Sequence, residues 1–206
     1  VNAVIYRSFQ PANYGTTLTI SAEQNPSLDV IKLLIKYGAD VNYKAKTEWD
    51  TDYTPFIASV RNPNVEIMKL LMTFSTGVAG QKSEALWWAV SAGNTAAVRI
   101  LLDSGAVYDY AGDAWYREFP LLIAATNGDS EIVRLLLESG VNVNEHLEDG
   151  KTALTTAMKN PEVVRLLLEE GAEISDKDVL ASTENLESLQ LLQQRGVVLT
   201  PEIATQ

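Results

Sequence analysis

The chain has 206 residues, and its 27 acidic side chains against 16 basic ones give a formal net charge of -11. That charge disfavours nucleic acid and anionic membrane surfaces as partners, because binding to phosphate groups is driven by Lys and Arg. The chain contains no cysteine, which excludes disulfides, thiolate nucleophiles and cysteine–zinc sites.

Six pairs of short helices are predicted along the chain. The first pair begins after Gly15-Thr16-Thr17-Leu18, and its second helix, over 29–37, stops at Gly38. Thr54 before Pro55 opens the second pair as an N-cap followed by a proline in the first turn, where its missing N–H costs nothing. The later helices are expected over 65–72, 85–90, 96–102, 119–125, 131–137, 149–157, 162–168, 176–183 and 186–194.

The second helix of each pair repeats one amphipathic pattern. Its most regular copy spans 131–140 and ends at Gly140. Placing the copies in register aligns Leu33, Leu70, Ile100, Leu135, Leu166 and Leu191. One such helix cannot bury its apolar face alone, so the recurrence predicts an array of stacked units.

Two copies depart from this pattern. Ser75 stands where the glycine stop belongs, and we expect the loop from there to Lys82 to be irregular. In the last pair, Gln190, Gln193 and Gln194 replace bulky apolar residues, as expected of a capping repeat.

The pattern resembles the ankyrin repeat. The matching residues are Thr54-Pro55, Pro120-Leu121, Ala124-Ala125, Gly93-Asn94, Gly128-Asp129, Gly38-Ala39-Asp40-Val41-Asn42 and Gly140-Val141-Asn142-Val143-Asn144. The resemblance implies an all-α ankyrin-repeat solenoid of about six helix-turn-helix units with extended inter-repeat fingers, forming a single domain over 1–206. The units are expected at about 1–42, 43–79, 80–109, 110–144, 145–174 and 175–206.

The sequence also departs from the family at its histidine position. That position is occupied by Thr19, Ile57, Trp87, Leu122 and Thr155. We therefore expect the hydrogen bonds that this histidine makes between repeats to be absent, with packing in their place.

Three of the fingers between units are longer than the connection from Asn144 to Thr152, and they are rich in aromatic residues. Exposed Tyr and Trp dominate interface hot spots, so the fingers are predicted to form a binding edge. The alternative is that the rings pack on one another as a hydrophobic ridge. The aromatic residues are Tyr6, Phe9, Tyr14, Tyr43, Trp49, Tyr53, Tyr108, Tyr110, Trp115 and Tyr116.

The resemblance implies a second binding surface, the concave face of the first helices. By register its exposed positions are Glu23, Gln24, Arg61, Asn62, Ser91, Ala92, Thr126, Asn127 and Lys159, and Trp88 lies on the same side, one turn before Ser91. Acidic residues accompany the finger aromatics, which indicates either ordinary solvation or a basic patch on the partner. These are Glu48, Asp50, Asp52, Asp109, Asp113 and Glu118.

The sequence offers no catalytic motif, and we predict no enzyme activity, cofactor or metal. The single histidine, His146, lies in a short finger, and Asp109, Asp113 and Glu118 lack the spacing of a calcium loop. No apolar run reaches the roughly 18 to 20 residues that span a bilayer and no leader is evident, so we expect a soluble chain, cytoplasmic or exported.

We expect a protein–protein interaction module that is monomeric on its own. Two alternatives stay open. One is an inhibitor or immunity-type protein that caps the active site of a partner enzyme. The other is a fragment of a larger multidomain protein or enzyme.

Overall fold

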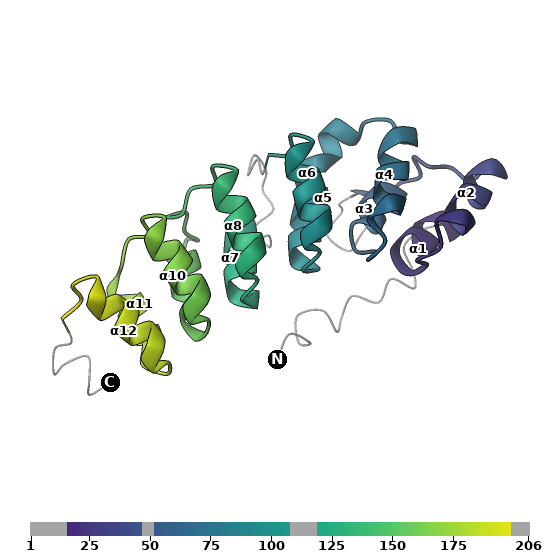
Figure 1. Ribbon diagram of the computed structural model, residues 1–206. Coiled ribbons are helices and arrows are strands. Elements are labelled where there is room, and N and C mark those ends of the chain that lie inside the picture. Colours follow the sequence, from purple (N-terminus) through teal and green to yellow (C-terminus); the bar gives the residue numbers. More distant parts are fainter. Residues whose placement is uncertain (1–15, 47–51, 108–118, 199–206) are drawn as a thin grey trace. The chain divides into compact units, whose positions relative to one another are not determined.

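The structure is a computed structural model that describes residues 16–46, 52–107 and 119–198 (Figure 1). The chain falls into two compact units that divide between Ala111 and Gly112. Residues 16–107 within the described ranges are called the first unit, and residues 119–198 the second unit.

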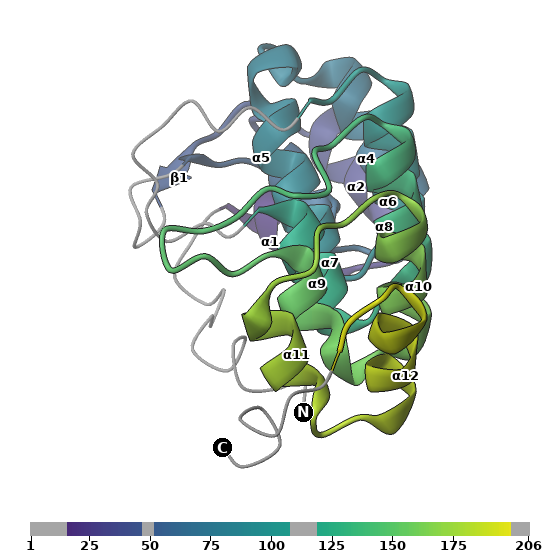
Figure 2. The same cartoon turned by 90° about the vertical axis from the view of Figure 1, so that its left-hand side faces the viewer.

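The first unit contains three helix pairs, each with a first helix and a second helix. The pairs are α1 (Thr17–Gln24) with α2 (Leu28–Lys36), α3 (Pro55–Ser59) with α4 (Val65–Phe74), and α5 (Val78–Ser91) with α6 (Thr95–Asp103). The first helices pack in one layer and the second helices in another (Figure 2). Each pair packs on the next through both layers, which buries the apolar faces that one helix could not bury alone.

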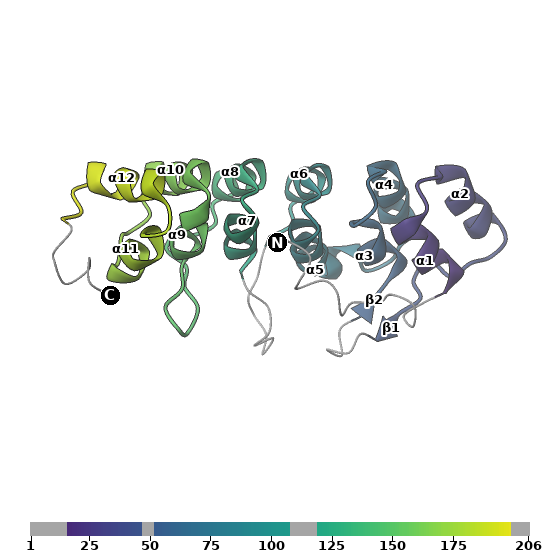
Figure 3. The same cartoon turned by 90° about the horizontal axis from the view of Figure 1, so that it is seen from below.

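A two-stranded antiparallel sheet lies in the connection between α2 and α3. Strand β1 (Ala45–Lys46) pairs with β2 (Asp52–Tyr53), with Ala45 opposite Tyr53. Figure 3 shows both strands on the side of the first helices, away from α2, α4 and α6. This finger was predicted as an extended connection, and its strands were not.

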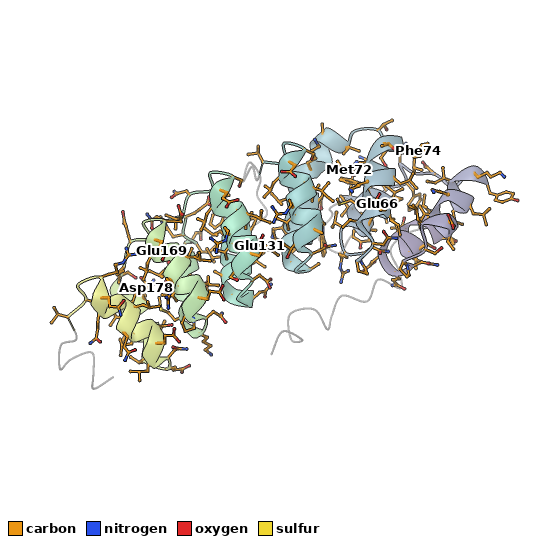
Figure 4. The ribbon with its side chains drawn as sticks, in the orientation of Figure 1. Glu66, Met72, Phe74, Glu131, Glu169 and Asp178 are labelled. Carbon is orange, nitrogen blue, oxygen red and sulfur yellow. The ribbon has the colours of Figure 1, made fainter. Side chains whose placement is uncertain are left out.

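The second unit contains three further pairs. They are α7 (Pro120–Asn127) with α8 (Ser130–Glu138), α9 (Ala153–Thr156) and its 3₁₀ extension η2 (Ala157–Lys159) with α10 (Pro161–Glu169), and α11 (Asp176–Ser182) with α12 (Leu186–Gln194). An isolated bridge between His146 and Thr152 closes the finger that connects α8 to α9. Two exposed glutamates of the second unit, Glu131 and Glu169, lie on its second helices α8 and α10 (Figure 4).

The local signals explain where the helices begin. The Thr54 hydroxyl accepts a hydrogen bond from the Ile57 N–H, and Pro55 occupies the first helical turn as predicted. The predicted all-α repeat fold is confirmed, with the small β1–β2 sheet as its only paired strands among the described residues. The single domain over 1–206 and the unit boundaries stay predictions.

Two structural expectations are wrong. The loop predicted to be irregular up to Lys82 ends at Gly77, whose φ of 72° turns the chain directly into α5. We also expected the position of the family histidine to make no hydrogen bond between repeats, but one such bond is present. Thr155 stands there and donates from Oγ1 to Oδ1 of Asp178 over 2.8 Å.

Asparagines provide further inter-repeat hydrogen bonds. Asn94 donates from Nδ2 to the carbonyls of Val60 and Asn62, at 2.8 and 3.0 Å, while its Oδ1 caps α6. In the second unit, Asn160 donates to the Ala125 carbonyl at 3.4 Å. These side chains satisfy carbonyls left over at the end of the preceding first helix.

Candidate protein-binding surface

Many of the predicted binding residues lie outside the described residues. They are Tyr6, Phe9, Tyr14, Trp49, Tyr108, Tyr110, Trp115 and Tyr116, and the same holds for Glu48, Asp50, Asp109, Asp113 and Glu118. Their assignment stays a prediction.

The other predicted residues divide by exposure. Tyr43 and Thr126 are exposed, and Arg61 and Asn127 are half-buried. The expectation of an exposed side chain is wrong for the remaining four, which are buried: Tyr53, Asn62, Trp88 and Ser91. It is also wrong for Glu23, whose side chain is 8% exposed.

The burial of these side chains has physical causes. Asn62 is buried because its Nδ2 donates to the carbonyls of Ala22 and Asn25, each at 2.9 Å, and so links α3 to the preceding repeat. Tyr53 and Trp88 are buried against each other, with ring centroids 5.9 Å apart in an edge-on arrangement. Register alone places a side chain on a face of a helix, but it does not show what the next repeat places against that face.

Three of these side chains form one group with Glu23 on the first-helix side of the first unit. Glu23 comes from α1, Tyr53 from β2, Arg61 from the turn after α3 and Trp88 from α5. We call them the Glu23 cluster. Three successive repeats and one finger therefore meet at a single place.

The Glu23 carboxylate is the centre of the cluster. Its Oε2 accepts a hydrogen bond from the Tyr53 hydroxyl at 3.0 Å, and its Oε1 accepts one from Arg61 at 2.6 Å. The side chain of Glu23 is 8% exposed and that of Arg61 22% exposed. A pair this close and this shielded is screened less by solvent than the surface pairs elsewhere in the chain.

The Trp88 rings contact both Tyr53 and Arg61 of the cluster. The Arg61 guanidinium carbon lies 5.8 Å from the centroid of the Trp88 ring, within the range of a cation–π contact. Trp87 packs edge-on against Trp88 at 5.0 Å. Arg61 is therefore held by an ion pair on one side and an aromatic ring on another.

The environment of Tyr53 keeps its hydroxyl protonated. Burial raises the pKa of this phenol above its ordinary value, and the negative charge of Glu23 raises that pKa further. Tyr53 consequently remains a hydrogen-bond donor to Glu23 throughout the physiological pH range.

Comparison with known proteins identifies the fold family. A family model described as ankyrin repeats (3 copies) matches residues 18–111 and 108–178. The chain belongs to the ankyrin-repeat family. It is similar to the crystal structure of the human ASB11 ankyrin repeat domain, with 25% identity, a TM-score of 0.75, and coverage of 90% of this chain and 86% of that one. No curated protein sequence matches the chain.

Ankyrin-repeat domains generally act as protein–protein interaction modules and are typically non-enzymatic binding scaffolds. Among the described residues of this ankyrin chain, no group of three or more His, Asp or Glu side chains could hold a metal ion. No helix in the described ranges is long and apolar enough to cross a membrane.

The second unit of the ankyrin array has no counterpart of the Glu23 cluster among the ion pairs and ring contacts of its described residues. Thr126 donates its hydroxyl to the Leu122 carbonyl, within its own helix. Lys159 and Glu184 form an exposed pair at 3.6 Å. On the second-helix side, a shallow groove is lined by Arg134, Glu162, Arg165, Leu166, Glu169 and Glu187.

Sequence reasoning missed the amino-terminal turns of α5. There Gln81 accepts a hydrogen bond from the Thr54 hydroxyl at 2.7 Å, and Lys82 and Ser83 donate to the carbonyls of Ser104 and Val107. The Lys82 and Ser83 contacts join α5 to the end of α6 in the same pair, and the Gln81 contact joins α5 to the preceding pair. The run of Ala, Gln, Lys and Glu residues before Ala85 was the available signal, because these residues favour helix.

Proposed function

We propose that this ankyrin-repeat chain binds a partner protein through the first-helix side of its first unit, with Arg61 at the centre and Tyr43 on the adjoining finger. The observation that carries the proposal is the Glu23 cluster. It holds a partly exposed arginine in place among aromatic rings.

Energetic arguments favour this place over the rest of the described surface. Arg, Tyr and Trp are the residue types most enriched at interface hot spots. An arginine already held by Glu23 and Trp88 has lost much of its rotamer freedom before binding, so it loses less entropy when a partner contacts it. Tyr43, which is 39% exposed, supplies a second side chain of the same class.

The acidic residues of the fingers bear on whether the partner carries a basic patch. Asp52 forms a 2.6 Å ion pair with Lys44, so this carboxylate is already neutralised within the chain. The basic-patch hypothesis therefore rests on the finger acids outside the described residues. It predicts that the affinity for the partner falls steeply with added salt, whereas an interface centred on Arg61 and aromatic rings responds weakly.

The test is affinity capture with the native chain, identification of the captured protein, and measurement of its affinity by calorimetry. We expect Arg61→Ala to weaken binding by about 2 kcal/mol, or roughly thirtyfold, as is typical of hot spots. Tyr43→Ala should weaken binding by a smaller factor. Equal affinity of the native chain and both variants would contradict the proposal.

The chain offers a matched control for each substitution. Arg134 is an exposed arginine on α8 of the second unit, and Tyr37 is a tyrosine 80% exposed at the end of α2. Arg134→Ala and Tyr37→Ala should leave the affinity within about threefold, the scatter expected of residues outside an interface.

The inhibitor hypothesis differs in the nature of the partner and uses the same finger. The β1–β2 hairpin lies beyond the layer of first helices, where it could enter a cleft (Figure 3). If the captured protein is an enzyme, stoichiometric addition of the native chain should abolish its turnover, and Tyr43→Ala should restore part of it. An unaffected turnover in the complex supports a non-inhibitory binding module instead.

A further inference from the structure

We propose that Tyr53 is a positioning residue that ties the β1–β2 finger to Arg61 through the Glu23 carboxylate, so that finger and first-helix surface recognise the partner as one unit. The inference rests on the proposed function for its meaning in recognition. The tether itself is a property of the chain alone.

Tyr53 lies at the base of the finger. It is the second residue of β2, pairs with Ala45 of β1 and directly precedes Thr54, which caps α3. A displacement of Tyr53 therefore moves the hairpin relative to the first helices. Its ring is 1% exposed, so it cannot itself contact a partner.

The Glu23 carboxylate joins the finger base to Arg61. One oxygen of Glu23 takes the Tyr53 hydroxyl and the other takes the Arg61 guanidinium. Because a carboxylate is rigid and planar, it limits the separation between the two donors that it accepts. The finger base and Arg61 are thus connected through one side chain.

Tyr53 and Arg61 also contact the same Trp88 ring. Tyr53 packs on Trp88 at 5.9 Å, and Arg61 lies over the same indole at 5.8 Å. The ring contact provides packing that survives removal of the hydroxyl. A variant that loses only the oxygen atom should keep the fold and lose the tether.

Tyr53→Phe is that variant, and Tyr43→Phe is its matched control. Both lose one phenolic oxygen from the same finger, but the Tyr43 side chain is exposed, whereas that of Tyr53 is buried and donates to Glu23. The measurement is amide hydrogen exchange of residues 43–46 and 52–53 in the full chain, with the amides of α1, α3, α5 and α10 as references.

We expect Tyr53→Phe to accelerate finger exchange about tenfold or more, as for loss of a hydrogen bond to a charged group. The helix amides should change by less than about threefold, and Tyr43→Phe should match the native chain. Unchanged finger exchange in Tyr53→Phe would overturn the proposal. Equal acceleration of the finger and of α1, α3 and α5 would also overturn it, since Tyr53 would then be an ordinary core residue.

A double-variant comparison identifies the carboxylate as the link. Glu23→Ala should accelerate finger exchange as well, and combining it with Tyr53→Phe should add no more than about twofold, because both remove the hydrogen bond between Tyr53 and Glu23. Multiplication of the two effects would show that the finger is not held through Glu23, and would overturn the proposal.

The recognition role is tested separately with the partner obtained by affinity capture. Tyr53→Phe should lower its affinity about tenfold, because the loosened finger must be ordered on binding. Accelerated finger exchange with an unchanged affinity would overturn the recognition role. If no partner is found, the proposed function fails, and the exchange measurements still decide whether the tether exists.

Discussion

The two units of the chain share one repeat architecture and use their polar side chains differently. The described residues of the first unit carry 7 acidic and 8 basic side chains, and those of the second carry 14 and 6. In the first unit, charged and aromatic groups gather at the Glu23 cluster. In the second, ion pairs such as Lys159–Glu184 and Arg165–Glu187 are exposed.

This difference indicates that the charged side chains of the two units have different roles. A surplus of exposed carboxylates keeps a protein soluble and contributes little to stability through individual surface pairs. A shielded ion pair on an aromatic ring fixes side chains in place, and that is the property a binding surface requires. The net charge of the chain therefore describes mainly the second unit and says little about the partner that we propose for the first.

The largest expected effect concerns the asparagines that link repeats. Asn94→Ala should lower the stability of the first unit by about 2 to 3 kcal/mol, because two carbonyls lose their donor and α6 loses its cap. Asn160→Ala removes a single 3.4 Å bond in the second unit and should cost about 1 kcal/mol or less. Urea unfolding resolved by amide exchange in α6 and α10 measures both. Equal costs would mean that the repeats of both units are linked equally well.

A smaller effect is expected at two left-handed glycines. Gly105→Ala places a Cβ in open space at φ of 81°, and the conformational strain should cost about 1 kcal/mol. Gly128→Ala has a similar φ of 78°, but its Cβ would lie 2.7 Å from Oδ1 of Asn160. Asn160 must then move and lose its bond to Ala125, which adds about 1 kcal/mol.

The glycine comparison has an internal control. In an Asn160→Ala background the extra cost of Gly128→Ala should disappear, and thermal unfolding of the single and double variants would reveal this. If Gly128→Ala keeps its extra stability cost in that background, the cost does not come from the contact with Asn160.

The last expected effect is a pH dependence that arises from Tyr53 in the first unit and appears only above neutral pH. The pKa of Tyr53 is raised by burial and by Glu23, so folding is stabilised below the ordinary tyrosine pKa of about 10 and loses that contribution as pH rises above it. The loss should be at most about 1.4 kcal/mol per pH unit. Comparing Tyr53→Phe with the native chain by urea unfolding at pH 9 and pH 11 isolates it. An identical pH dependence of stability in the native chain and in Tyr53→Phe would show that folding does not raise the pKa of Tyr53.

Much of the fold could be predicted from the sequence because the repeat makes each local signal recur. The helices at 131–137 and 186–194 were placed within about two residues, since glycine stops and apolar periodicity agree there. The start of α5 was missed because Ser75 broke the glycine pattern, while Gly77 supplied the left-handed residue two positions later.

The candidate site was predictable only in part. Arg61 and Trp88 were assigned to the first-helix side from register, and Tyr53 was recognised as a finger aromatic. Their meeting at Glu23 involves residues 30 and 38 positions apart in sequence, and no periodicity specifies which side chain crosses to the next repeat. The prediction that Tyr53 and Trp88 are exposed failed for the same reason, since the two side chains cover each other.

The central claim is that recognition belongs to the first-helix side of the first unit. Its most direct test is amide hydrogen exchange of the full chain, alone and in complex with the protein obtained by affinity capture. Our account predicts that binding slows exchange in residues 43–46, 52–62 and 88–92 and leaves residues 119–198 unchanged. Protection confined to residues 119–198 would contradict it.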